Sequence, residues 1–332
     1  MQEYNKKEAK GLFSRIGFTY VIGSIMVLGI QEIIILLLKN IKPEWYEDKN
    51  IGMLFTMLPV YFIIYPVFLA LINLIPKSAP IEKHKMSVGQ FLVALIMCYS
   101  LIYTGNIASS ILISFLSKIN GLAPTNVVMG MLGGTNVWIQ LFILVIFPPI
   151  FEELIFRKFL IDRTIKYGEF VSILLSATLF CLFHGNFSQG IYAFLLGGFL
   201  AYIYIRTGKI GYTISFHMII NFIGSIVAGR LLDLIKYSEL VEKLSSGDTE
   251  AYLLFVQENI VGYMIYFAYV IFLFVVVIVG IILFIVLRKR FFLKSNEMDI
   301  PKGERFKTLF INPGIIVFFL FWIGMYIFSL FG

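Results

Sequence analysis

The chain alternates long apolar runs with short polar connectors along its whole length. Runs of about 18 or more apolar residues are long enough to cross a membrane as helices. The pattern predicts an all-α protein, a polytopic transmembrane helical bundle of about eight or nine spans. We place nine runs near residues 16–38, 51–75, 88–117, 136–164, 168–187, 189–206, 211–232, 258–287 and 310–331. The third and fourth exceed a simple span, so we expect them to project or kink.

Composition supports an integral membrane protein. Of the 332 residues, 59% are hydrophobic and 14% are charged, whereas soluble domains carry roughly 25% charged residues. The apolar run 16–38 is far longer than the roughly 7–15 apolar residues of a signal peptide, so we expect it to be a retained first span. Cys98 and Cys181 lie in apolar segments without a CxxC spacing, which excludes a disulfide framework and a thiolate metal site.

The basic residues predict the orientation of the chain. With the N-terminus in the cytoplasm, the cytoplasmic segments hold twenty of the 27 Lys and Arg residues, and the opposite side holds seven. This bias follows the positive-inside rule. It also explains the net charge of +7, so we expect no nucleic acid partner.

Ionisable side chains lie inside the apolar runs of the central part of the chain. They are Glu152, Glu153, Arg157, His184 and His217. Each such group near the centre of a membrane helix costs roughly 2.5–3.5 kcal/mol, and intramembrane ionisable residues are usually functional. We therefore expect chemistry at this site.

The sequence before the acidic pair predicts a broken helix. Pro148 and Pro149 interrupt the hydrogen-bond ladder and free carbonyl groups, which protein or water must satisfy at membrane depth. Glu153 and Arg157 are four residues apart and can pair. Glu152 then lies on a different face of the helix, free to meet another group.

Simple helix geometry suggests which groups face each other. Glu152 and His184 are each sixteen residues from Gly168, the expected turn between the fourth and fifth spans. Antiparallel helices from that turn bring both to a depth of roughly 24 Å, where they can activate a water. His217 and Asn221 share one helix face and can donate to an oxyanion. Counted from a turn near Gly208, His217 is shallower, which requires a tilted helix, an irregular entry at Gly211 or a less compact site.

Other features of this region favour structural roles. Ala193, Gly197 and Ala201 form a small-xxx-small row for close helix approach. Asn186 and Gln189 follow His184 in a polar loop. Farther along, we expect the mixed-charge segment 233–257 to be a solvated connector, with a short amphipathic surface helix as the alternative.

The central motifs resemble a known family. They are Glu-Glu-x-x-x-Arg (Glu152, Glu153, Arg157), Phe-x-x-x-His (Phe180, His184) and His-x-x-x-Asn (His217, Asn221). In this order, on consecutive spans, they look like the CPBP family, also called Abi. It includes the type II CAAX prenyl proteases and bacterial homologues linked to bacteriocin self-immunity or peptide processing. We therefore divide the chain into N-terminal spans (1–135), a CPBP-like catalytic core in the fourth to seventh spans (136–232) and C-terminal spans (233–332).

The resemblance implies an intramembrane endopeptidase that cuts a membrane-embedded or lipidated peptide, in a prokaryotic plasma membrane. By residue, Glu152 is the general base and His184 helps to hold and polarise the water. His217 and Asn221 steady the oxyanion, and Glu153 is a supporting carboxylate paired with Arg157.

Two questions stay open at this point. Glu152, His184 and His217 can also form a zinc site with an open fourth position. We favour a mechanism without a cofactor, since there is no His-Glu-x-x-His helix. The competing functions are a non-enzymatic membrane scaffold or bacteriocin-immunity protein and, third, a proton-coupled transporter.

Overall fold

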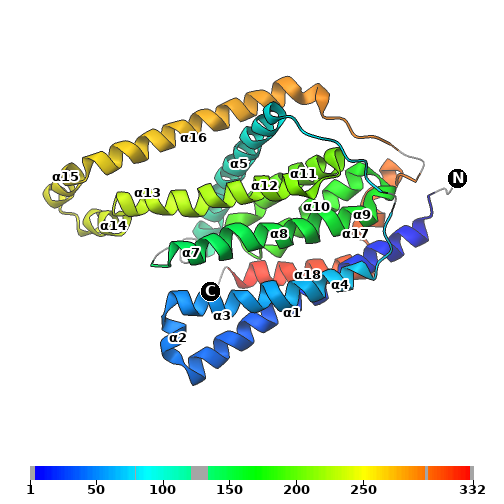
Figure 1. Ribbon diagram of the computed structural model, residues 1–332, viewed down its shortest axis with the longest axis horizontal. Helices are drawn as coiled ribbons and strands as arrows, with labels where there is room; N and C mark the ends of the chain where they lie inside the picture. The colour runs from blue at the N-terminus through cyan, green and yellow to red at the C-terminus, as the bar shows by residue number, and fades with distance from the viewer. Residues whose placement is uncertain (1–3, 79, 121–133, 296–297, 330–332) are drawn as a thin grey trace.

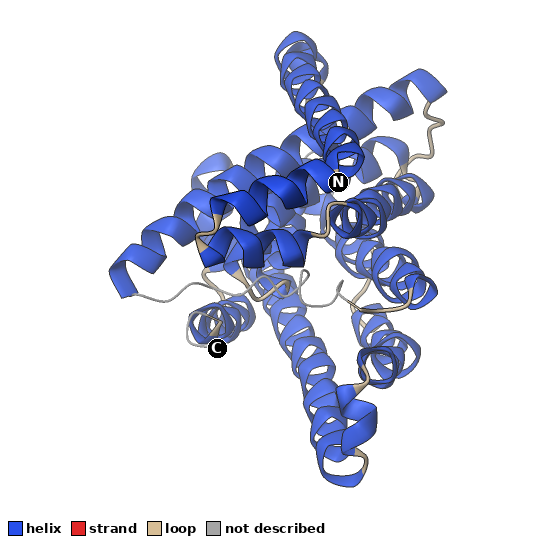
Figure 2. Cartoon of the chain, turned by 90° about the vertical axis from the view of Figure 1, so that its left-hand side faces the viewer, coloured by secondary structure: helices blue, strands red, loops and turns tan. Residues whose placement is uncertain are grey.

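The computed structural model describes residues 4–78, 80–120, 134–295 and 298–329. Within these ranges the chain forms helices and loops and no strands (Figure 1, Figure 2). Seven of the described helices are long and apolar enough to cross a membrane, and a bent pair, Lys302–Phe310 with Pro313–Phe328, can add an eighth. The prediction of a polytopic transmembrane helical bundle is confirmed, and the described residues hold seven or eight candidate spans where the apolar runs predict nine.

The described elements follow one another along the chain, with η marking π- and 3₁₀-helical segments. They are α1 (Lys6–Ile41), α2 (Pro43–Glu47), α3 (Lys49–Pro59), η1 (Val60–Ile64), α4 (Tyr65–Asn73), α5 (Val88–Asn120), α7 (Val137–Gln140), η2 (Leu141–Ile146), α8 (Phe147–Glu153), η3 (Leu154–Phe159), α9 (Leu160–Thr164), η4 (Ile165–Tyr167), α10 (Glu169–Phe183), α11 (Phe187–Thr207), α12 (Ile210–Asn221), η5 (Phe222–Val227), α13 (Ala228–Leu234), α14 (Tyr237–Ser246), α15 (Thr249–Glu258), α16 (Ile260–Leu287), η6 (Arg288–Arg290), η7 (Lys302–Glu304), α17 (Arg305–Phe310) and α18 (Pro313–Phe328).

Two of the nine predicted spans differ in the structure. The run 168–187 contains α10, whose 15 residues extend about 22 Å, less than the roughly 30 Å of a bilayer core. It is followed by a turn in which Gly185 has a φ of 65°, a left-handed conformation that glycine adopts without strain. At the end of the chain, Asn312 caps α18 and Pro313 occupies its first turn, so a new helix starts there at 66° to the preceding one.

The helices pack around two apolar clusters. One cluster joins α1, η1, α4, η3, α10 and α18. The other joins α5, α11 and α12, with partly buried side chains of α16 against it. In Figure 1, α5 and α16 lie on one side of the central helices, and α1, α3, α4 and α18 lie on the other. Glu153 and Arg157, on the central helices, are fully buried in this arrangement.

Several segments predicted to be cytoplasmic meet at one end of the bundle. Lys6 pairs with Glu304, Lys166 pairs with Glu8, and Arg206 pairs with Glu169. These contacts bring together the start of α1, the α9–α10 and α11–α12 turns and the segment after α16. At the other end, the segment 233–257, expected as a connector, is largely helical: it forms α14 and α15, capped at Asp248.

Candidate active site

The helix that carries the acidic pair departs from α-helical geometry on both sides of that pair. α8 holds Glu152 and Glu153 and is flanked by the π-helical segments η2 and η3. Pro148 has no backbone N–H, so it cannot donate to the carbonyl of Leu144 four residues earlier. Short π-helical segments occur often at functional sites. The hydrogen-bond ladder is irregular at the proline pair, as predicted, but the helix does not break there, since Val137–Tyr167 continues as one helical span.

Side chains from four other helical segments hydrogen bond to carbonyl groups of this irregular helix. Two of these bonds precede the Glu pair and two follow it. They are Asn221 Nδ2 to Leu144 O (2.9 Å), Tyr61 Oη to Ile143 O (2.9 Å), Tyr20 Oη to Ile155 O (2.6 Å) and Ser176 Oγ to Phe156 O (2.7 Å). Carbonyls freed at membrane depth need such partners, so the surrounding helices fix the position of the irregular segment.

His217 lies between the two glutamates. Its Nδ1 is 2.9 Å from Glu153 Oε1, and its Nε2 is 3.7 Å from Glu152 Oε2. The Glu153 side chain is fully buried, whereas that of Glu152 is 17% exposed. Glu153 is therefore placed to orient the imidazole, and Glu152 is the carboxylate that another molecule can reach. The helix count places His217 at a shallower depth than the two glutamates, yet in the structure it lies next to both of them.

Arg157 pairs with Glu153 as predicted from their spacing. Its Nε lies 3.2 Å from Glu153 Oε2, and both side chains are fully buried. The guanidinium also lies over the ring of Phe180, 4.0 Å from the centroid. Neither guanidinium Nη atom has a hydrogen-bond acceptor within the described ranges. Charge attraction to Glu153 and the cation–π contact thus hold Arg157 in place.

His184 is held by Phe180 and forms neither a hydrogen bond nor an ion pair with Glu152. Its Nδ1 is 2.8 Å from the Phe180 carbonyl oxygen, and its ring meets the Phe180 ring edge-on, with 4.7 Å between centroids. The Phe180 ring is also edge-on to His217, at 5.9 Å. We expect Glu152 to face His184, but in the structure Glu152 lies next to His217 instead. His184 is nearby, and the Phe180 ring contacts both histidines.

The small residues of α11 make room for these side chains. Ala193 and Ala201 are fully buried. A Cβ atom at Gly197 would lie 2.9 Å from the Phe180 ring and 3.3 Å from Arg157 Nη2. The predicted close approach of helices is present, and at Gly197 it directly adjoins the predicted site residues.

The polar loop after His184 is bonded within itself. Asn186 caps α11 by accepting from the backbone N–H of Gln189, and its amide donates to Gln189 Oε1 and to the His184 carbonyl. Gln189 in turn donates to Tyr192 Oη at 2.9 Å. These bonds support the structural role expected for the loop.

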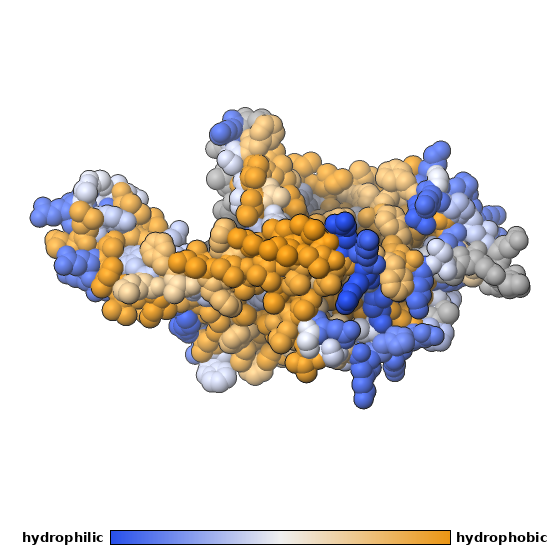
Figure 3. All heavy atoms as spheres, turned by 90° about the horizontal axis from the view of Figure 1, so that it is seen from above, coloured by the Kyte–Doolittle hydropathy of each residue, from blue (hydrophilic) through white to orange (hydrophobic). Residues whose placement is uncertain are grey.

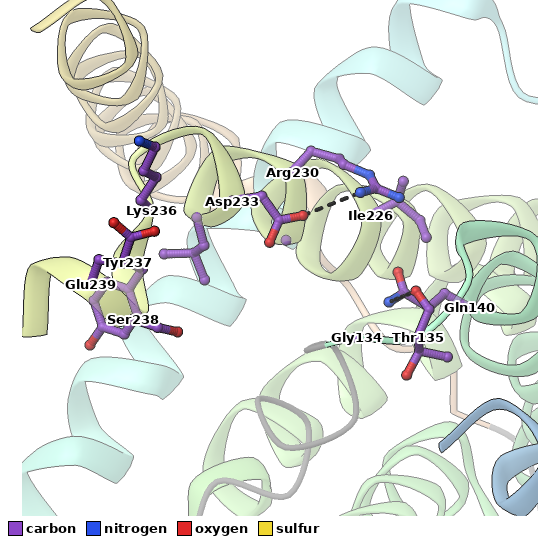
Figure 4. A pocket seen from close by; sticks show the side chains of 12 residues that line it. Gly134, Thr135, Gln140, Ile226, Arg230, Asp233, Lys236, Tyr237, Ser238 and Glu239 are labelled. Atoms are coloured by element: carbon purple, nitrogen blue, oxygen red, sulfur yellow. Dashed lines mark hydrogen bonds and ion pairs between the residues drawn. The ribbon is translucent and has the colours of Figure 1, made fainter. Parts of the chain in front are cut away.

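A separate pocket of about 510 Å³ opens beyond this cluster, between the start of α7 and the α13–α14 turn. Figure 4 shows its polar lining, in which Arg230 pairs with Asp233 at 3.2 Å. Gln140 and Ile226 belong to the same two helices as Leu144 and Asn221, farther from the Glu pair. None of the six predicted site residues lines it.

The proposed zinc ligands do not converge on a metal-binding geometry. Among the described residues, no group of three His, Cys, Asp or Glu side chains is arranged to hold a metal ion. Glu152, His184 and His217 do not form such a group in this structure, so they do not fit the expected zinc set.

Sequence reasoning missed the residues that brace the irregular helix. Tyr20, Tyr61 and Ser176 are distant in sequence from the carbonyls that they bind, up to 135 residues away. The proline pair signals that carbonyls are freed, but nothing local to it identifies the donors. Buried hydroxyl groups in apolar helices are the one available clue.

The geometry agrees with a comparison against protein families. Residues 134–223, which include all six predicted site residues, match the family model described as type II CAAX prenyl endopeptidase Rce1-like. This part of the chain belongs to the CPBP family of CAAX-type proteases. Searches of curated proteins and of solved structures gave no match. For residues 134–223 the match therefore supports, at the level of the family, a membrane-embedded protease of the CAAX type.

Proposed function

We propose that the protein is an intramembrane endopeptidase in which Glu152 activates a water molecule against a peptide bond. The observation that carries this proposal is the position of His217 between Glu153 and Glu152, at 2.9 and 3.7 Å. A buried carboxylate that orients an imidazole, next to a second carboxylate that remains accessible, is a suitable arrangement for general acid–base chemistry.

In the first step, Glu152 takes a proton from water as the water oxygen attacks the carbonyl carbon of the scissile bond. His184, held through Nδ1 by the Phe180 carbonyl, helps to hold the water. The carbonyl oxygen then carries a negative charge, which needs hydrogen-bond donors that are already in place.

His217 and Asn221 supply those donors in the proposed mechanism. Glu153 engages His217 Nδ1, and a protonated imidazole therefore directs its Nε2–H away from Glu153. Asn221 donates to Leu144 O with one amide hydrogen, and a side-chain amide has a second hydrogen to offer.

In the second step, the C–N bond of the intermediate breaks. The proton held by Glu152 passes to the leaving nitrogen, so the products are a carboxyl group and an amine, and Glu152 returns to its carboxylate form. Arg157 stays paired with Glu153 throughout, with its Nε 3.2 Å from Glu153 Oε2.

The substrate in this proposal is a membrane-embedded or lipidated peptide, reached from within a prokaryotic plasma membrane. We place the N-terminus in the cytoplasm. The ion pairs gather several of the predicted cytoplasmic segments at one end of the bundle, and the excess of Lys and Arg in these segments supports a cytoplasmic position for that end.

The decisive experiment is mass spectrometry of membrane peptides from cells that carry the wild-type protein or Glu152→Gln. We expect peptide ends that appear with wild type and are absent with Glu152→Gln at equal protein abundance. Identical peptide sets would contradict the protease. A biological phenotype that survives in both Glu152→Gln and His217→Ala would favour the scaffold or immunity protein, and solute uptake lost in Glu152→Gln would favour the transporter.

A further inference from the structure

A cluster of basic side chains follows the most apolar helix of the protein. α16 is the least buried of the candidate spans, and it leads directly into η6, which consists of Arg288, Lys289 and Arg290. Lys294 follows four residues later, and all four side chains are exposed. Figure 3 shows hydrophilic surface directly beyond the apolar run of this face.

These four cations have no acidic partner within the described residues. The ion pairs among the described residues all involve other cations. The nearby carboxylate of Glu169 is already engaged by the guanidinium of Arg206 and by the backbone N–H of Lys294. The positive charge of the cluster therefore remains available to an external anion.

The backbone of the cluster is fixed to the bundle by α11. Tyr202 donates to the Arg290 carbonyl at 3.5 Å, and Arg206 donates to the Phe292 carbonyl at 2.9 Å. The Phe291 ring packs on Tyr202, at 5.5 Å, and on Phe284 of α16, at 5.8 Å. The cations are thus presented from an ordered segment.

Apolar side chains accompany the charges. Phe292 is 58% exposed and Leu293 is 43% exposed, next to an apolar helix whose surface faces outward. Positive groups beside exposed apolar surface, at the end of a membrane helix, match the two parts of a phospholipid, its phosphate headgroup and its acyl chains.

We infer that Arg288, Lys289, Arg290 and Lys294 form a binding site for anionic phospholipid headgroups. The acyl chains of the bound lipid lie along α16. Because Tyr202 and Arg206 belong to α11, the lipid also stabilises the end of the helix that carries Gly197.

The test uses the full-length protein in two kinds of lipid nanodisc, phosphatidylcholine alone and phosphatidylcholine with about 20 mol% phosphatidylglycerol. Native mass spectrometry measures the retained lipid, and a thermal scan measures stability. We expect the wild-type protein to retain phosphatidylglycerol preferentially and to unfold at a higher temperature in the mixed discs. The variant Arg288→Gln, Lys289→Gln, Arg290→Gln, Lys294→Gln should lose most of both effects.

A matched control removes four other positive charges from the same end of the bundle, with Lys7→Gln, Lys10→Gln, Arg15→Gln and Lys302→Gln. This control should keep both effects. Equal loss in the two variants would mean that general surface charge attracts the lipid, which would overturn the site. Retention of phosphatidylglycerol by the first variant at the wild-type level would overturn it as well.

Discussion

The amide of Asn221 donates a hydrogen bond to the carbonyl of Leu144, the acceptor that Pro148 leaves without its helical partner. A residue expected only as an oxyanion donor therefore also braces the helix of the acidic pair. Tyr61 does the same for the adjacent carbonyl of Ile143. The position of Glu152, the proposed general base, thus depends on side chains that bond to the backbone of its helix.

This relationship predicts that Asn221→Ala lowers the free energy of unfolding, because the carbonyl of Leu144 loses its hydrogen-bond donor. Loss of the amide leaves a buried carbonyl unsatisfied, which costs about 1–3 kcal/mol. In a Pro148→Ala background the new backbone N–H at position 148 can bond to Leu144, so the loss caused by Asn221→Ala should shrink. The wild type, the two single variants and the double variant are unfolded in the same detergent. Their free energies of unfolding give the stability loss caused by Asn221→Ala with and without Pro148.

The same double-mutant cycle separates structure from catalysis. If Asn221 also donates to the oxyanion, its removal should lower the cleavage rate about 100-fold or more in both backgrounds. An unchanged stability loss in the Pro148→Ala background would contradict the bracing role.

The buried pair of Glu153 and Arg157 predicts an asymmetric response to substitution. Arg157→Met leaves the carboxylate of Glu153 buried without its partner, and we expect a stability loss of about 3–5 kcal/mol. Adding Glu153→Gln removes the charge and keeps an oxygen acceptor for His217. The double variant should therefore recover most of the stability in a denaturation experiment. A double variant as unstable as Arg157→Met alone would show that the charge pair is not the cause.

Gly197 predicts a position-specific effect on activity. Its replacement by Ala places a methyl group 2.9 Å from the Phe180 ring, so Phe180 must shift, and with it His184 and Arg157. We expect cleavage to fall about 10-fold to 100-fold, since small misplacements at a site have effects of this size.

The neighbouring glycine is the control for this prediction. A Cβ atom at Gly198 meets the nearest atom, Ala177 Cβ, at an ordinary 3.6 Å. Gly198→Ala should leave the rate near that of the wild type. Equal effects at the two positions would point to a general packing defect of α11.

The proposed mechanism also predicts the response to chelation. Because its reacting groups are carboxylates, imidazoles, the Asn221 amide and water, thorough chelation of the purified protein should leave cleavage unchanged. Loss of cleavage on chelation, with recovery on addition of zinc, would instead establish the metal-dependent mechanism. The metal content of the same samples shows whether cleavage rises and falls with bound zinc.

Local rules predicted the local features of the site. The spacing of Glu153 and Arg157 predicts their ion pair, and the proline pair predicts the interrupted hydrogen-bond ladder around α8. The apolar runs predict a polytopic helical bundle, because spanning length is a property of each run. Each of these inferences needs only neighbouring residues.

Predictions that depended on counting along helices were less accurate. The predicted equal depth of Glu152 and His184 assumed that regular α-helices run from a shared turn. The π-helical segment η3, however, lies between the Glu pair and that turn. A π-helix places more residues in each turn, so the count overestimates how far Glu152 lies from the turn. His217, expected at a shallower level, is instead the histidine that contacts both glutamates. The predicted span 168–187 is also too long, because α10 ends before the turn at Gly185. The largely apolar composition of 168–187 gives no sign of that turn.

The spacing of Glu153 and Arg157 also bears on how the protein reaches the membrane. Both belong to one helix, so their charges can neutralise each other as soon as that helix forms. His217 is synthesised sixty residues after Arg157 and can join the pair only later. The segment can therefore enter the bilayer during synthesis without waiting for α12, and assembly of the site becomes a second event, the docking of one inserted helix on another.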